Sequence, residues 1–225
     1  MASFTRLKVL NTIVEIGLVP VFYNPNLDTA KKIVMACAGG GARVVEFTNR
    51  GDHAVEIFTE LEKYCRKELP DLILGVGSVI DPYTAAMYIN YGANFVVGPL
   101  LNPEVARICN RRKIPYSPGC GSATEISTAE ELGCEIIKVF PGEQVGGPEF
   151  VKAVLAPCPW VSMMPTGGVE CSQESLKAWF GAGVVAVGIG SQLIRKDLLQ
   201  AGDFEGIKNG VKKTLEIIGQ VRKKA

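Results

Sequence analysis

A lysine inside an otherwise apolar run is the residue of this chain best suited to chemistry. Lys138 lies within Cys134-Glu135-Ile136-Ile137-Lys138-Val139-Phe140-Pro141, where five apolar residues surround it. Burial of this run as a strand would strip water from the ammonium group and lower its pKa toward the neutral amine. A neutral amine at the end of a buried strand is what Schiff-base chemistry on a carbonyl substrate requires. The alternative is an ordinary lysine whose head group reaches solvent.

A carboxylate and a guanidinium share one face of a second expected strand. In residues 44–50, alternation places Glu46, Thr48 and Arg50 on the same side. A general base beside a clamp for a substrate carboxylate needs this pair of groups. The alternative is a Glu–Arg pair that only ties the fold together. Together with Lys138, three inward-facing charges are hard to explain by packing, which favours a functional site.

Glycine-rich turns and a hydroxyl follow other expected strands. Thr166-Gly167-Gly168-Val169 and Gly188-Ile189-Gly190-Ser191 come after the last two strands. There, backbone N–H groups can approach a phosphate at a short helix N-terminus. Each tract alone could be an ordinary tight turn, but both at these positions favour a phosphate site. Ser78, after Gly75-Val76-Gly77, offers a hydroxyl for the substrate, unless it merely forms a turn.

The elements that must position these residues alternate regularly. Eight short apolar runs, most followed by a helical pattern, predict parallel strands. An additional helix is expected over 4–16, and no linker divides the chain. We therefore expect one α/β domain over residues 1–225, a (β/α)₈ TIM barrel with an extra N-terminal helix and its active site at the strand C-termini. The strands are expected at 18–23, 42–48, 72–78, 95–100, 114–118, 135–141, 160–165 and 184–189.

Composition narrows the classes of function. A net charge of +1 gives no reason to expect nucleic acid or an acidic membrane surface as a partner. No run is long enough for a membrane span, and no signal peptide is evident, so a cytoplasmic location is expected. The seven cysteines are scattered and odd in number, as in a reducing compartment. His53 is the single histidine, which excludes a zinc site built on several histidines. Cys120, in an expected loop over 118–122, has no histidine placed to activate it.

These residues, in this order, make the chain resemble the 2-keto-3-deoxy-6-phosphogluconate (KDPG) aldolase family, which is also known for 4-hydroxy-2-oxoglutarate (KHG) aldolase activity. The likeness runs over residues 18–193. Its most specific blocks are Val45-Glu46-Phe47-Thr48-Asn49-Arg50, Gly75-Val76-Gly77-Ser78, Ile137-Lys138-Val139-Phe140-Pro141 and Pro165-Thr166-Gly167-Gly168-Val169.

The resemblance implies a role for each matching position. Lys138 matches the Schiff-base lysine, and Glu46 matches the general acid and base. Arg50 and Thr166 match residues that hold the substrate carboxylate, and Phe140 matches an aromatic that packs on bound pyruvate. The phosphate-contacting turns match Gly167, Gly168, Gly190 and Ser191. We also count Pro99, in the run expected as the fourth strand, among the substrate-binding candidates.

The resemblance further implies a class I aldolase without metal or cofactor, commonly a homotrimer. Its substrate would be a small 2-keto-4-hydroxy acid, phosphorylated in the case of KDPG, which yields pyruvate and glyceraldehyde 3-phosphate. Cleavage of 4-hydroxy-2-oxoglutarate would yield pyruvate and glyoxylate. Three departures from the family concern the aldehyde half: Ser78 replaces a threonine, Asn49 replaces an apolar residue, and the loop Gly119-Cys120-Gly121-Ser122 differs.

Two other readings fit the glycine turns. One is a thiamine-phosphate-synthase-like transferase, which would need Mg²⁺ and a diphosphate. The other is a catalytically silent barrel that binds phosphosugars. Neither accounts for a buried lysine facing a Glu–Arg pair.

Overall fold

The computed structural model describes residues 2–223, and within this range there are nine strands and ten helices, which alternate except that β6 directly follows β5 and α10 directly follows α9. The strands are β1 Leu18–Phe22, β2 Val44–Thr48, β3 Ile73–Gly77, β4 Val96–Val97, β5 Tyr116–Ser117, β6 Gly119–Cys120, β7 Ile137–Val139, β8 Met163–Pro165 and β9 Val187–Ile189. The helices are α1 Arg6–Ile16, α2 Leu27–Gly39, α3 Ala54–Glu68, α4 Pro82–Asn90, α5 Pro103–Arg112, α6 Ala123–Glu131, α7 Gly147–Leu155, α8 Gln173–Gly181, α9 Lys196–Ala201 and α10 Phe204–Arg222.

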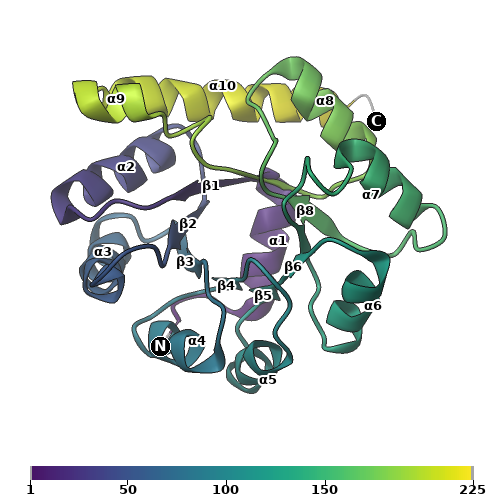
Figure 1. Cartoon of the computed structure of the whole chain (residues 1–225). Coiled ribbons are helices and arrows are strands. Elements are labelled where there is room, and N and C mark those ends of the chain that lie inside the picture. The colour runs from purple at the N-terminus through teal and green to yellow at the C-terminus, as the bar shows by residue number, and fades with distance from the viewer. Residues whose placement is uncertain (1, 224–225) are drawn as a thin grey trace.

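The strands pair in parallel in two curved sheets. One sheet has the order β5-β4-β3-β2-β1-β9, and the other has the order β6-β7-β8. A parallel bridge between Thr166 and Gly188 links the end of β8 to β9. Figure 1 shows the strands arranged as a ring with the helices α2 to α10 on its outside. The expected α/β fold with parallel strands is thereby confirmed.

The fifth expected strand needs a correction. It was expected over 114–118, with a loop over 118–122, but Gly119 and Cys120 form β6. Pro118 has no N–H group to donate to a ladder, so the strand changes partner at this residue. Before it, β5 pairs with β4, and after it, Gly119 lies opposite Lys138 of β7. Ser122 lies outside the strands and helices, and its side chain caps the N-terminus of α6.

Strand alternation divides the core into two layers. One set of strand residues packs outward against the surrounding helices, with Val45, Phe47, Ile137 and Val139 among them. The other set points into the ring, where it forms a smaller apolar cluster with side chains of α1. The inner cluster consists of Val9, Leu10, Ile13, Val19, Val44, Ile73, Phe95, Val97, Ile136, Met164 and Ala186.

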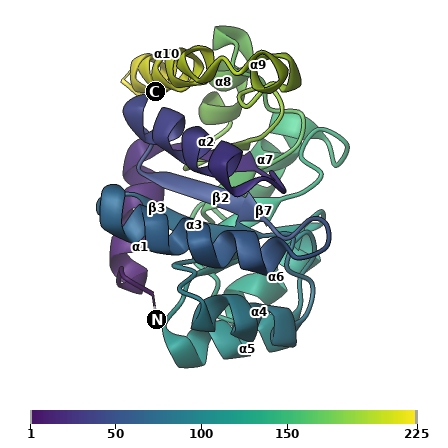
Figure 2. The same cartoon turned by 90° about the vertical axis from the view of Figure 1, so that its left-hand side faces the viewer.

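The extra N-terminal helix closes one end of the ring. Its buried residues Val9, Leu10 and Ile13 contact residues at the N-terminal ends of several strands. Figure 2 shows α1 lying at the end of the molecule from which β2 starts. The helix begins after Thr5, whose side chain accepts a hydrogen bond from Lys8 N, rather than at residue 4.

Helix caps set the remaining boundaries. Asn26, Asp81, Asn102 and Ser172 each accept backbone N–H groups at the start of a helix, as the sequence predicts. Each of these caps fixes the residue at which the loop after a strand ends and the next helix begins. None of the helices in residues 2–223 is both long and apolar enough to cross a lipid bilayer.

Candidate active site

Lys138 lies in β7 with its side chain directed into the ring. The residue is 5% exposed, so its head group does not reach bulk solvent as the alternative reading required. Its Nζ lies 4.4 Å from the centroid of the half-buried Phe140 ring, within the range of a cation–π contact. Burial lowers the pKa of Lys138, and Arg50 adds to this, whereas the nearby Glu46 opposes it. Burial thus shifts the pKa of Lys138 in the direction of the uncharged amine.

Glu46 lies in β2 and faces the same interior. It is 2% exposed, and burial raises the pKa of its carboxyl group although Lys138 and Arg50 act in the opposite direction. Its Oε2 has no hydrogen-bond partner among the described residues. A Cβ atom on Gly77 of the neighbouring strand would lie 1.7 Å from Glu46 Oε1, so the carboxylate fits only because residue 77 is glycine.

Thr166 presents a second unpaired oxygen to this interior. Its Oγ1 is buried without a hydrogen-bond partner among residues 2–223, and a Cβ atom on Gly188 would lie 2.4 Å from it. A buried polar atom left unpaired costs about 1–3 kcal/mol, so such atoms are usually completed by a ligand or water. Glu46 and Thr166 therefore mark a place where a polar molecule can bind beside Lys138.

Arg50 and Ser78 meet at the ends of β2 and β3. Arg50 is exposed, and its Nε donates a hydrogen bond of 3.2 Å to Ser78 Oγ. Ser78 itself has a left-handed backbone with φ of 59°, which few residues other than glycine adopt. The structure thus brings together two of the side chains that the sequence suggests for substrate binding.

The two glycine turns are adjacent but differ from expectation in one respect. Gly167 and Gly168 have φ values of 89° and 78°, which other residues rarely adopt. After Gly190, the N–H groups of Leu193 and Ile194 both bond to the Gly190 carbonyl, which makes a turn. A short helix N-terminus was expected here, but the next helix begins only at Lys196. Gly190 and the exposed Ser191 thus offer turn backbone, not a helix dipole, to an anion.

Three further residues stand out in the sequence: Pro99, Cys120 and His53. Pro99 follows β4 and lies half-buried, with its carbonyl oxygen close to Gly119. Cys120 is buried, and burial raises the pKa of its thiol to about 12, which makes it a poor nucleophile. His53 is an exposed residue before α3 whose Nδ1 lies 2.9 Å from Glu56 Oε1. Among residues 2–223, no group of three or more His, Cys, Asp or Glu side chains could hold a metal ion.

The sequence missed the role of two glycines and one tyrosine. Gly77 and Gly188 provide the space for the Glu46 and Thr166 side chains, whereas the sequence indicates only turns at these positions. The buried Tyr88 of α4 donates a hydrogen bond of 2.8 Å to Asn49 Oδ1, beside Arg50. The sequence does not indicate this contact, because an aromatic residue on the buried face of an amphipathic helix is expected simply to pack in the core.

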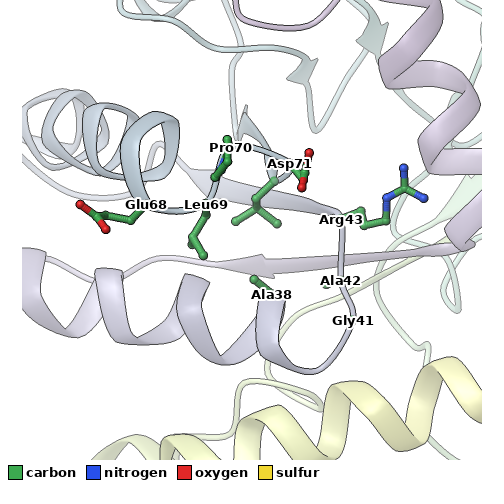
Figure 3. A pocket seen from close by; sticks show the side chains of 9 residues that line it. Ala38, Gly41, Ala42, Arg43, Glu68, Leu69, Pro70 and Asp71 are labelled. Atoms are coloured by element: carbon green, nitrogen blue, oxygen red, sulfur yellow. The ribbon is translucent and has the colours of Figure 1, made fainter.

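A pocket of about 420 Å³ lies elsewhere, where the chain enters β2 and β3. Figure 3 shows Arg43, Glu68 and Asp71 around it, together with apolar residues such as Leu69. No candidate catalytic or substrate-binding residue lines this pocket. It lies at the strand N-termini, so it is not part of the proposed active site.

Comparison with known proteins agrees with this geometry. The family model described as KDPG and KHG aldolase matches residues 9–209. The 2-dehydro-3-deoxy-phosphogluconate aldolase of Haemophilus influenzae is 30% identical over 96% of this chain and 99% of its own length. The KHG/KDPG aldolase of Escherichia coli is 30% identical over 88% of this chain and 91% of its own. The KDPG aldolase of Legionella pneumophila, solved with pyruvate captured as a covalent carbinolamine, superposes with a TM-score of 0.82 at 26% identity, covering 90% and 96% of the two chains. The chain belongs to the KDPG and KHG aldolase family.

Proposed function

We propose that this protein is a class I aldolase that cleaves a 2-keto-4-hydroxy acid through a Schiff base on Lys138. The substrates are 2-dehydro-3-deoxy-6-phosphogluconate, which gives pyruvate and glyceraldehyde 3-phosphate, and 4-hydroxy-2-oxoglutarate, which gives pyruvate and glyoxylate. The observation that carries the proposal is a lysine 5% exposed inside the ring whose pKa is lowered by burial. Membership of the family supports the same reaction.

In the proposed reaction, Lys138 forms the covalent intermediate and Glu46 transfers protons. The neutral amine adds to the C2 ketone and loses water to form an iminium, which accepts the electrons of the breaking C3–C4 bond. Glu46 removes the C4 hydroxyl proton as the aldehyde leaves, directly or through one water. Because burial raises its pKa, the carboxylate is a stronger base than an exposed glutamate and also holds a proton at higher pH. It can therefore return the proton to C3 of the enamine before hydrolysis releases pyruvate.

The other residues hold the substrate. Arg50, Ser78 and Thr166 bind the carboxylate, since the first two are hydrogen-bonded and the third has an unpaired buried oxygen. Phe140 packs on the pyruvate half beside Lys138, and Pro99 shapes the same end of the ring. The turns with Gly167, Gly168, Gly190 and Ser191 bind the phosphate when the substrate carries one.

The architecture is part of the proposal. We infer that the two sheets form one closed (β/α)₈ barrel within a single domain. The bond from Val185 N to Met163 O and the Thr166–Gly188 bridge support closure on one side, since they join β8 to β9. On the other side, only Pro118 separates β5 from β6. All seven cysteines are free thiols, which supports a cytoplasmic location.

A homotrimer also belongs to the proposal. Five of the nine large apolar side chains that the described residues expose fall within residues 80–100. Tyr83 and Met87 lie four residues apart in α4, and Tyr91, the residue that caps its C-terminus, continues this spacing, so they share one face. Tyr83 is 84% exposed. Apolar surface of this kind is typical of a contact between subunits.

The two alternative functions, a transferase and a non-catalytic binding protein, predict different experimental results. A transferase using Mg²⁺ and a diphosphate would lose activity in EDTA, whereas an aldolase of this class would not. A silent sugar-phosphate-binding barrel would bind ligand without releasing pyruvate. A buried amine beside an unpaired buried carboxylate oxygen is the feature that favours the aldolase over both.

The Schiff base can be trapped directly. Borohydride added with pyruvate should reduce the imine and leave a stable mass increase on the peptide that contains Lys138. Lys138→Arg should give no adduct, because its guanidinium remains charged. Glu46→Gln should still give the adduct but lower turnover about a hundred-fold or more. An adduct on a different lysine, or none in the wild type, would refute the proposed reaction.

Removing the buried amine should stabilise the protein while abolishing activity. Lys138→Met should raise the free energy of unfolding by about 1 kcal/mol, measured by urea denaturation at neutral pH. Because the pKa of Lys138 is lowered in the folded state, the unfolded chain binds this proton more tightly. The wild type is therefore penalised most below the folded-state pKa, and the penalty disappears as pH rises through about 10.4.

The advantage of Lys138→Met should accordingly shrink as pH rises toward that value. Lys177→Met, which removes an exposed lysine, should change stability by less than about 0.5 kcal/mol at any pH. An advantage that grows with pH would contradict a lowered lysine pKa.

The phosphate turns can be tested with a charge. Ser191→Asp places a carboxylate in the turn, where it repels the dianionic phosphate on C6 of the sugar acid. The far end of 4-hydroxy-2-oxoglutarate is a singly charged carboxylate at C5, which is too short to reach a phosphate turn. We expect kcat/KM for the phosphorylated sugar acid to fall about ten-fold. The value for 4-hydroxy-2-oxoglutarate should stay within about two-fold. Ser127→Asp on α6 makes the same charge change at an exposed position and should affect neither. Equal losses for both substrates would remove Ser191 from the phosphate site.

The molecular mass in solution tests the oligomer. Light scattering should give three times the chain mass of 24.2 kDa for the wild type. Tyr83→Glu should shift the mass toward one chain, because burying a carboxylate between subunits is costly. Leu7→Glu, at a 71% exposed position on α1, should leave the trimer intact. A monomeric wild type would exclude the trimer, and a trimeric Tyr83→Glu would exclude the α4 face.

A further inference from the structure

A tyrosine hydroxyl is buried where a phenylalanine would fill the same space. Tyr88 of α4 is fully buried, and its ring packs edge-on against Phe58 with centroids 5.0 Å apart. Its hydroxyl donates a hydrogen bond of 2.8 Å to Asn49 Oδ1, 39 residues away in the chain. Burial raises the pKa of Tyr88 to about 12, so the hydroxyl keeps its proton at neutral pH. A hydrogen bond between this buried hydroxyl and the half-buried Asn49 needs a reason beyond filling volume.

Asn49 immediately precedes the arginine proposed to clamp the substrate carboxylate. The backbone N–H of Asn49 donates to the Gly77 carbonyl at 2.8 Å, and the N–H of Arg50 donates to the Thr48 carbonyl at 2.8 Å. The peptide from which the Arg50 side chain departs is thus tied to β3 by its backbone and to α4 by the Asn49 side chain. Asn49 is also a position where the chain departs from the apolar residue usual in the family.

The other end of the arginine is fixed separately. Arg50 Nε donates to Ser78 Oγ at 3.2 Å, yet the side chain is otherwise exposed. A long exposed side chain loses conformational freedom when it binds a ligand, and anchoring its root reduces that cost. The contact between Tyr88 and Asn49 anchors the root, whereas Ser78 holds the tip.

We propose that Tyr88 is a positioning residue for substrate binding, which acts through Asn49 to hold Arg50 at the mouth of the active site. The inference rests on the proposed function, because it assumes that Arg50 binds the keto-acid carboxylate. Tyr88 itself lies in the outer apolar layer and does not touch the substrate.

Kinetics of Tyr88→Phe test the proposal. The ring remains, so the packing against Phe58 is kept, while the hydroxyl is lost and Asn49 is left unpaired. KM for the keto acid should rise about three- to ten-fold, the range that one buried hydrogen bond supports. The half-saturating pyruvate concentration for borohydride trapping should rise by the same factor. The value of kcat should change less than two-fold. Lys138 lies in β7, away from Asn49, and the side chain of Glu46 points to the opposite side of β2 from that of Asn49.

Two further variants separate positioning from general stability. In the Arg50→Ala background, Tyr88→Phe should leave KM unchanged, because its target is gone. The double variant Asn49→Leu/Tyr88→Phe removes the same hydrogen bond without leaving an unpaired polar group, so its KM should rise as much as that of Tyr88→Phe. A KM that returned to the wild-type value would overturn the positioning role, because the unpaired amide would then be the cause of the loss. Thr12→Val removes a buried hydroxyl from α1, at the opposite end of the ring, and should leave KM unaltered.

The outcomes distinguish this inference from the function on which it rests. If the wild type forms no adduct with pyruvate, the proposed function itself fails. If the wild type is trapped but Tyr88→Phe keeps a wild-type KM, only the positioning role fails. A rise in KM of the same size in the Arg50→Ala background would also overturn it, because Tyr88 would then act by another route.

Discussion

The exclusion of water from Lys138 is the constraint on which the arrangement of the site depends. An ammonium group enclosed by apolar side chains loses hydration that a single neighbouring carboxylate restores only in part. The fold therefore holds this nitrogen where its neutral form is favoured, beside Phe140 and opposite the interior face of β2. Glu46 is subject to the same burial with the opposite effect, so an acid and a base are shifted toward each other.

Space for these groups is created by residues without side chains. Glycines at 77 and 188 leave room for the Glu46 carboxylate and the Thr166 hydroxyl, and both oxygens remain unpaired. At Gly75, the vacant volume is instead filled by the Phe95 ring, which belongs to the apolar cluster on α1. In β3, the space beside Gly75 is thus filled by an apolar core side chain, whereas the space beside Gly77, two residues later, holds a candidate catalytic carboxylate. That change follows from strand alternation combined with depth along the ring.

Sequence reasoning succeeded where the governing physics is local. Strand positions followed from short apolar runs, caps such as Asn26 and Asp81 followed from their side chains, and the inward face of Glu46 followed from alternation. It failed where the outcome depends on partners distant in the chain. The division of one strand into β5 and β6 reflects which neighbour lies on each side of Pro118. The contact between Tyr88 and Asn49 crosses from a helix to a loop, and no spacing rule indicates it.

Helix α1 fills the end of the ring opposite the candidate site. With Val9, Leu10 and Ile13 filling the far end, reactants and products must pass through the same opening. In the proposed reaction, the pyruvate half is bonded to the deep lysine and the aldehyde half lies nearer the exit. The aldehyde must then depart before pyruvate, and synthesis in reverse must admit pyruvate first. The covalent bond to Lys138 sets this order, and α1, which fills the opposite end of the ring, leaves both products to depart from the same end.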